Sequence, residues 1–202
     1  FEQYSSTNRV HLTWCDQRCQ EDLWGYGMGT GALLSLRNSS SYPVYTGDQS
    51  VEYLYDTDDG YAVHDYAEAW LPLSKVGFTD WTSVDVRLLT LFFYGDPLND
   101  ATSKEQMYVG VKDTDGLYGE MRYGDHSGEA LTDIQVAEWQ RWDVPFIWFT
   151  DSNSAAPNDV NFAGMESVHI GFGNRRVEQA GGLGYVYFDD VRLNLPICKP
   201  EY

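Results

Sequence analysis

The sequence predicts an all-β protein, an antiparallel β-sandwich of the jelly-roll type. Short apolar or alternating segments recur along the chain, and turn-forming residues separate them. The composition, with 15 Tyr, 7 Trp and 19 Gly, suits strands and turns better than helices. The sequence contains no internal repeat, heptad or long amphipathic helix. Ten or so strands joined by turns indicate a sandwich, and a barrel is the main alternative.

The segments predicted to be extended are rich in apolar or alternating residues, and most are followed by Gly, Pro, Asn, Asp or Ser. In chain order they cover 1–4, 9–14, 31–36, 51–55, 66–73, 86–94, 107–111, 117–123, 139–144, 146–149, 168–172 and 184–195. The run 86–94 is broken only by Arg87 and Thr90, which predicts a central strand. The turn at 113–116 reads Asp-Thr-Asp-Gly and predicts a hairpin. Residues 124–137 are expected to form a loop with one helical turn.

The chain length predicts a single domain over 1–202. A chain of 202 residues buries roughly 70% of its unfolded surface, so it can hold a core without help. No run of about 18 apolar residues is present, so no membrane insertion is expected. The chain begins at Phe1 without a Met or a signal peptide, and we expect a mature segment of a larger secreted protein.

The net charge excludes whole classes of ligand. A formal charge of -18 argues against nucleic acid, because phosphate binding needs a basic face and only 13 Lys and Arg are present. Anionic membranes and sulfated polymers are disfavoured for the same reason. Neutral ligands and divalent cations remain, although most carboxylates of such an acidic protein serve solubility.

The three cysteines are an odd number, and their spacing does not determine a pairing. Cys15 and Cys19 are close in sequence, and Cys198 lies at the far end. In an extracellular protein one pair is expected to form a disulfide, with the third thiol free. No His stands at the spacing from them that a zinc site requires.

Two carboxylates interrupt the last predicted strand. Asp189 and Asp190 would point to opposite faces of a regular strand, so one of them faces the apolar side chains nearby. A buried ionised Asp is costly unless a cation or several donors satisfy it, and calcium prefers such oxygen ligands. The alternative is a slight bulge that leaves both side chains in water.

Counting strands predicts two functional ends. If the strands reverse direction each time, one end collects the loops 15–30, 56–65, 95–106, 124–137 and 174–183. The opposite end collects the start of the first strand, the entry to the strand at 51 and the tail of the last strand. Glu2, Gly47, Asp48 and Asp189 should therefore converge.

Several blocks of sequence, taken together and in order, carry a family resemblance. They are Phe1-Glu2, Tyr66-Ala-Glu-Ala69, Asp80-Trp-Thr82, Leu91-Phe-Phe-Tyr-Gly-Asp96, Glu105-Gln-Met-Tyr-Val109, Trp139-Gln-Arg-Trp142, Ile170-Gly-Phe-Gly173 and Tyr187-Phe-Asp-Asp-Val-Arg-Leu193. The chain resembles a domain of large secreted proteins of planctomycete-type bacteria. More distantly, it resembles the galactose-binding-like β-sandwich carbohydrate-binding modules.

The resemblance implies a jelly-roll module with a structural calcium (Ca2+) near the chain ends. It implies metal ligands from Glu2, from Asp189 and from the turn that holds Gly47 and Asp48. It also implies a secreted or cell-surface protein, attached catalytic or surface domains, and no catalysis in the module itself. The Cys-rich and Trp-rich loop at 15–31 departs from the family pattern.

The predicted ligand is a polysaccharide or other glycan, because sugars stack on aromatic rings and bind planar polar groups. The predicted ligand-binding residues share the first loop end: Trp24, Tyr26, Tyr61, Asp96, Asn99 and Arg175. Further candidates there are His64, Tyr123, His126 and Asn174. Among the other aromatics, Trp81, Trp139 and Trp142 are expected in the core, while Trp70 and Trp148 are left open.

The sequence therefore predicts a non-catalytic module for a neutral polysaccharide. Two alternatives remain: an adhesion or surface-layer domain, and a jelly-roll glycoside hydrolase that uses two carboxylates. The carboxylates available for hydrolysis are Glu68, Glu120, Glu138 and Glu166. None of them lies in a compact catalytic motif.

Overall fold

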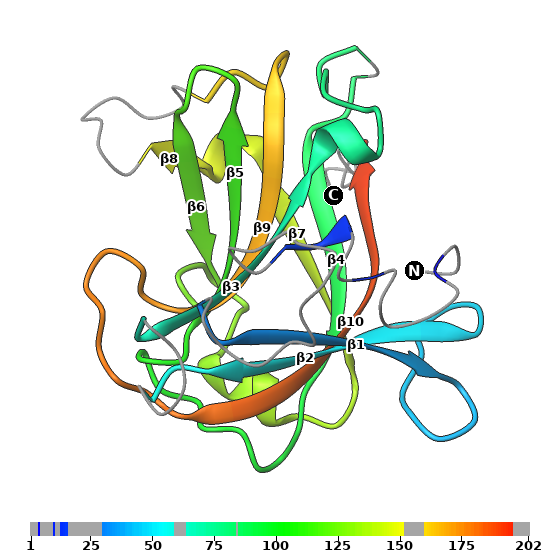
Figure 1. Ribbon diagram of the computed structural model, residues 1–202, viewed down its shortest axis with the longest axis vertical. Helices are drawn as coiled ribbons and strands as arrows, with labels where there is room; N and C mark the ends of the chain where they lie inside the picture. The colour runs from blue at the N-terminus through cyan, green and yellow to red at the C-terminus, as the bar shows by residue number, and fades with distance from the viewer. Residues whose placement is uncertain are drawn as a thin grey trace, which may run out of the picture.

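Two antiparallel five-stranded sheets form the protein in the computed structural model (Figure 1). In order across the first sheet, the strands are β1 (Ala32–Asn38), β2 (Gln49–Asp56), β10 (Leu183–Asn194), β4 (Leu88–Tyr94) and β7 (Trp139–Pro145). Across the second sheet they are β3 (Tyr66–Pro72), β9 (Met165–Gly173), β5 (Met107–Asp113), β6 (Tyr118–Arg122) and β8 (Thr150–Asp151). We call these the β10 sheet and the β9 sheet. The predicted antiparallel β-sandwich is confirmed.

The structure describes residues 4, 10, 13–15, 30–58, 64–83, 85–151 and 160–195. Three 3-10 turns accompany the strands in these residues: η1 (Leu73–Lys75), η2 (Leu131–Gln135) and η3 (Phe146–Trp148). Within the same residues, no helix has the length and apolar character needed to cross a membrane.

The core lies between the sheets, where alternate residues of each strand meet. Val186 and Phe188 of β10 face Phe172 and Ile170 of β9, as the period of two requires. Trp81 and Trp142 are buried in this core, as predicted. Trp139 is not, because its register with Tyr94 places it on the outer face of the β10 sheet.

Two predicted strands are wrong. Val10 and Thr13 are helical, and the Trp14 amide donates to the Val10 carbonyl at 2.7 Å, so part of 9–14 forms a helical turn. The segment 146–149 is the turn η3, closed by a bond from the Phe149 amide to the Phe146 carbonyl at 3.1 Å. Pro145 ends β7 before it, because Pro supplies no amide for a sheet ladder.

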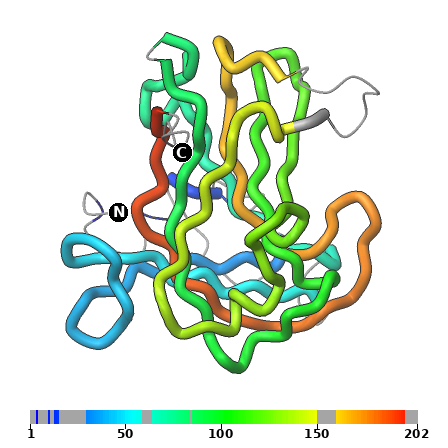
Figure 2. Tube along the Cα trace, turned by 180° about the vertical axis from the view of Figure 1, so that it is seen from behind, coloured from blue at the N-terminus to red at the C-terminus, as the bar shows by residue number. Residues whose placement is uncertain are grey.

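The predicted loop end is present in the described residues. The Thr57 amide donates to the Gly182 carbonyl at 2.9 Å, and the Gly173 amide donates to Gln106 at 3.1 Å. Loop 174–182 (orange) and loop 39–48 (light blue) lie on opposite sides of the molecule (Figure 2). This separation matters because each loop borders a different outer sheet face.

Candidate functional site

The outer face of the β9 sheet carries two cross-strand rows of polar and aromatic residues. Their sequence neighbours, such as Ala67, Val109 and Ile170, point into the core. The first row holds Glu68, Gly171, Tyr108 and Arg122, and the second holds Trp70, His169, Gly110 and Glu120. Both rows run from β3 to β6.

Two glycines let aromatic rings lie flat on this face. A Cβ atom added at Gly110 would collide with the phenol of Tyr118. One added at Gly171 would collide with the ring of Tyr108. The glycines therefore determine where both phenol groups sit.

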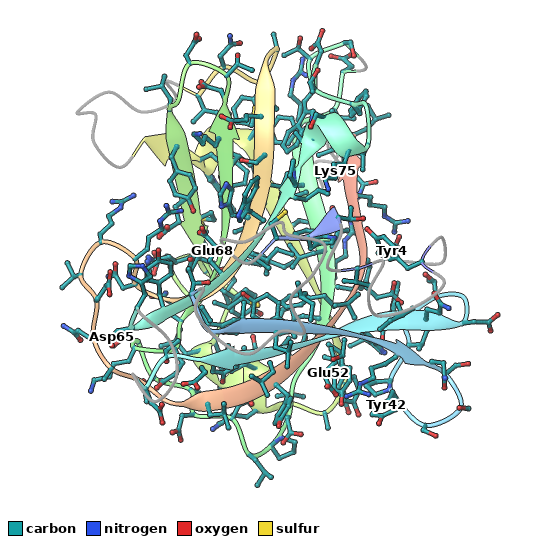
Figure 3. All side chains as sticks on the ribbon, viewed as in Figure 1. Tyr4, Tyr42, Glu52, Asp65, Glu68 and Lys75 are labelled. Atoms are coloured by element: carbon teal, nitrogen blue, oxygen red, sulfur yellow. The ribbon has the colours of Figure 1, made fainter. Side chains whose placement is uncertain are left out.

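Glu68 is the centre of a network that we call the Glu68 cluster: Glu68, Tyr108, Tyr118, His169 and Arg175. Arg175 donates to Oε2 of Glu68 at 2.8 Å, and Tyr108 and Tyr118 donate to the same oxygen at 3.0 and 3.4 Å. Nδ1 of His169 lies 3.1 Å from Oε1, an electrostatic contact whose angles are not those of a hydrogen bond. The Arg175 guanidinium also covers the Tyr118 ring at 4.3 Å. Figure 3 shows Glu68 near the middle of the molecule, with Asp65 at one end of β3.

The cluster holds fixed charges. Burial acts to raise the pKa of Glu68, but His169, Arg175 and Tyr108 outweigh it and hold this pKa below its usual range. Burial, reinforced by the Glu68 charge, raises the pKa of Tyr108 and of Tyr118 well above the usual value. Glu68 is therefore a carboxylate at neutral pH, and both phenols stay protonated as donors.

Ser167, His169 and Glu68 stand in the order of a catalytic triad. Oγ of Ser167 lies 2.9 Å from Nε2 of His169, whose Nδ1 faces Glu68. Ser167 is only 2% exposed, however, so a substrate does not reach its hydroxyl. The contacts act as a structural network.

The face also brings together two of the predicted hydrolase carboxylates. Glu68 and Glu120 each lie within 3.5 Å of the Tyr118 hydroxyl. Hydrolysis needs one of the pair protonated, with a raised pKa. The pKa of Glu68 is lowered instead, and Glu120 is ion-paired with Arg122 at 2.7 Å. Glu138 and Glu166 lie on the surface.

An open cavity of about 600 Å³ adjoins these rows, within the size range of small-ligand sites. We call it the Trp148 pocket. Its lining comes from β6, the loop after β6, η3 and the loop after β9: Glu120, Met121, Arg122, Asp125, His126, Ile147, Trp148, Asn174, Arg176 and Val177. The rings of His126 and Trp148 stack at 3.9 Å with an angle of 7° between their planes.

Polar groups surround this stacked pair. Oδ1 of Asp125 accepts a bond from Gln106 at 2.9 Å. Oδ1 of Asn174 accepts bonds from two backbone amides of its own loop, which fixes the loop shape. Every other arginine in the described part of the chain is ion-paired, but the Arg176 guanidinium makes no ion pair with a described residue.

The predicted ligand-binding residues do not all meet at this pocket. Trp24, Tyr26 and Tyr61 lie outside the described residues. Oδ1 of Asp96 accepts a bond from the Leu98 amide in a surface turn. Arg175 belongs to the Glu68 cluster.

Asn99 holds the loop end together. Its amide group donates to the carbonyls of Ile134 and Tyr185 and accepts from the Tyr185 amide, all within 2.8 Å. The residue is 2% exposed, and these three bonds occupy both the nitrogen and the oxygen of its side-chain amide.

His126 and Asn174, which the sequence places at the first loop end, both line the Trp148 pocket, whereas the direction of Trp148 is left open by the sequence. Trp148 follows Pro145 in a segment without alternation, so no sequence period indicated its direction. The sequence feature that could have indicated a turn at Trp148 is Pro145, which ends β7.

The last strand bulges at the two aspartates. Its register with β4 shifts between Asp189 and Arg192, and Asp190 has a φ of 53°. Asp190 is half-buried and pairs with Arg192 at 3.0 Å, whereas Asp189 is only 3% exposed. The bulge therefore does not leave both side chains in water.

Asp189 meets the loop that precedes β2. Its Oδ2 accepts bonds from the amides of Tyr45 and Thr46 at 3.0 and 3.1 Å, and its Oδ1 accepts one from the Asp190 amide at 2.7 Å. Burial raises the pKa of Asp189, and these amides oppose the rise. The turn with Gly47 and Asp48 is thus close in sequence to the contact, while Glu2 lies outside the described residues.

Two N–H donors lie at Oδ2 of Asp189, the atom that a cation would also contact. No group of three or more His, Cys, Asp or Glu among them is placed to hold a metal.

No protein-family model and no curated protein matches the chain. Among solved structures, it is similar to one described as a structural analysis of an exo-beta-agarase, with a TM-score of 0.54 and 14% identity over 85% of this chain and 24% of that one. It is also similar to the family 11 carbohydrate-binding module of the cellulosomal cellulase Lic26A-Cel5E of Clostridium thermocellum. There the TM-score is 0.51 and the identity 16%, over 93% of this chain and 92% of that one. At this identity the likeness concerns the fold, which is the β-sandwich of such modules.

Proposed function

We propose that the chain is a non-catalytic carbohydrate-binding module whose Trp148 pocket holds a sugar unit of a neutral polysaccharide. The observation that carries this proposal is the stacked pair of His126 and Trp148 in an open cavity lined with hydrogen-bonding side chains. An aromatic surface beside a few polar groups is the usual composition of a small-ligand site.

The pocket chemistry suits a sugar. The apolar face of a pyranose packs on an aromatic ring, and its hydroxyls bond to planar polar groups. Asp125 offers an acceptor, while Arg176 and Asn174 offer donors. Because Glu120 neutralises Arg122, and Asp125 and Arg176 have opposite charges, the pocket favours a neutral ligand.

The Glu68 cluster supports this site from one side. Arg175 lies between Asn174 and Arg176, and its ion pair with Glu68 anchors the loop that carries both. The cluster thus positions two pocket residues without contacting the sugar itself.

Secretion and attachment to other domains are part of the proposal. Cys15 is disulfide-bonded, and disulfides persist in oxidising compartments. A module of this fold that covers 24% of an agarase chain is consistent with attached catalytic domains. The resemblance to planctomycete-type secreted domains also points outside the cell.

A structural calcium bound at Asp189 is a further part of the proposal. Its support is the buried carboxylate next to the loop with Gly47 and Asp48, together with the family resemblance. Glu2 is the second carboxylate that we propose for it.

Affinity gel electrophoresis tests the pocket. The names of the similar structures suggest agarose and hydroxyethyl cellulose as probes. Replacing Trp148 with Ala removes a stacking ring worth about 1 to 1.5 kcal/mol, so Trp148→Ala should bind the retarding polymer about tenfold more weakly.

Phe78→Ala is the matched control, because Phe78 is an exposed ring that does not line the pocket. Retardation of Phe78→Ala should equal that of the unaltered protein. Unchanged retardation of Trp148→Ala would contradict the pocket, and new reducing ends during incubation would favour a hydrolase.

A further inference from the structure

The outer face of the β10 sheet carries a row of aromatic residues, whereas the Trp148 pocket borders β6 of the β9 sheet. Strand register places Tyr187 opposite both Glu52 and Tyr94, and Tyr94 opposite Trp139. The row therefore crosses four neighbouring strands, β2, β10, β4 and β7. Successive strands lie about 4.8 Å apart, which spaces the rings along the row.

The rings of this row contact one another. Tyr187 and Tyr94 have ring centroids 6.2 Å apart, and Tyr94 and Trp139 have centroids 5.6 Å apart. The loop before β2 adds two more rings, with Tyr42 at 6.3 Å from Tyr187 and Tyr45 at 5.7 Å from Trp139. We call these five residues the aromatic row.

The aromatic row is partly open to solvent. Tyr42 is 37% exposed and Tyr45 is 40% exposed, while the other three rings are half-buried. Figure 3 shows Tyr42 beside Glu52 on the side of the molecule away from Glu68. The row is therefore separate from the Glu68 cluster.

Charges on this face are paired within the face. Arg37 binds Glu52 at 2.5 Å, Arg141 binds Asp143 at 3.0 Å, and Arg192 binds Asp190 at 3.0 Å. Each cation is thus matched by a carboxylate, in a protein whose formal charge is -18. The face is locally close to neutral, which complements a neutral partner and offers little to a charged one.

Hydrogen-bonding groups border the aromatic row. Glu52 accepts a bond from the Tyr187 hydroxyl at 2.9 Å, and the Arg37 guanidinium lies 4.5 Å from the centre of the Tyr42 ring. Rings beside a fixed carboxylate and a guanidinium match the two kinds of contact that a sugar makes. The row extends across strands, which suits an extended polymer better than a compact ligand.

We propose that the aromatic row is a second carbohydrate-binding surface, which takes a neutral polysaccharide chain. With the Trp148 pocket on the other sheet, the module then holds two chains and links them. The inference shares its ligand class with the proposed function but depends on different residues.

Isothermal titration with cellohexaose and with agarohexaose tests it. The unaltered protein should bind two molecules of one of these oligosaccharides. Trp139→Ala should weaken the second site about tenfold, so that one binding event remains. Tyr42→Ala, at an exposed position that does not threaten folding, should weaken the same site severalfold, and Phe78→Ala should change neither.

Two events in both the Trp139 and Tyr42 variants, or a single event in the unaltered protein that Trp148→Ala removes, would overturn the second surface. Trp148→Ala separates the two proposals. If it removes one of two events, both stand, whereas two remaining events would remove the pocket and leave the aromatic row. Binding of neither oligosaccharide would contradict both.

Discussion

At the scale of single residues, Glu68 shows how one buried carboxylate organises a sheet face. It accepts bonds from Arg175 and from two phenols, and it lies beside His169. Sequence alone suggested Glu68 only as one of several hydrolase carboxylates. Its partners come from four different segments, and local pattern carries no information about such convergence.

The lowered pKa of Glu68 predicts a pH effect on stability. Folding favours the ionised form of Glu68, so its ionisation stabilises the folded state. This stabilisation is complete above the ordinary pKa of 4.5 and is lost as the pH falls through the lower pKa of the folded state. Melting curves between pH 3 and 7 should show this acid loss. Glu68→Gln should make stability less dependent on pH in this range, and it should lower the free energy of unfolding by about 1 to 3 kcal/mol at neutral pH.

Glu166→Gln is the comparison for that measurement. Glu166 forms an exposed ion pair with Lys112 at 2.8 Å, which contributes little. If the two variants have the same acid profile, Glu68 does not have the role assigned to it here.

At the scale of elements, turn-forming residues predicted the structure better than apolar runs did. The hairpin between β5 and β6 was predicted from its Asp-Thr-Asp-Gly turn, and Gly116 there has the positive φ of 88° that favours glycine. The turn η3 was not predicted, because an apolar run of four residues fits a strand and a buried turn equally well. The outward direction of Trp139 also depended on register, and a one-residue slip would reverse it.

Gly171→Ala tests the flat packing of Tyr108 on β9. The added methyl would meet both the Tyr108 ring and the Ala67 carbonyl of β3, which should cost about 1 to 3 kcal/mol in the free energy of unfolding. Denaturant unfolding measures this cost. Gly182→Ala is the control, because its added Cβ meets only ordinary contacts at 3.4 Å. Equal stability of the two variants would show that the ring does not need the glycine.

At the scale of the whole molecule, counting strand reversals predicted which loops meet. The contacts of Thr57 with Gly182 and of Asp189 with Thr46 follow that prediction at opposite ends. Which sheet face holds a pocket could not be predicted, because this depends on where η3 and loop 174–182 close around β6. The prediction of a neutral glycan came from net charge and stays a prediction; on the outer face of the β10 sheet, Arg37, Arg141 and Arg192 are each paired with a carboxylate.

The proposed calcium site concerns the whole chain, because its proposed ligands come from both ends. If the free calcium concentration is about a hundredfold above the Kd, removing calcium with a chelator should lower the melting temperature by about 5 to 10 °C. Differential scanning calorimetry with and without EGTA measures this shift, and Asp189→Ala should abolish it. Identical melting in calcium and in EGTA would remove calcium from the proposal.

The central claim is that sugar binds at Trp148, and NMR titration of the tryptophan indole N–H signals tests it most directly. Adding cellohexaose or agarohexaose should shift the Trp148 signal, while the signals of the core residues Trp81 and Trp142 stay in place. A Trp148 signal that stays fixed while the protein binds the oligosaccharide would contradict the claim.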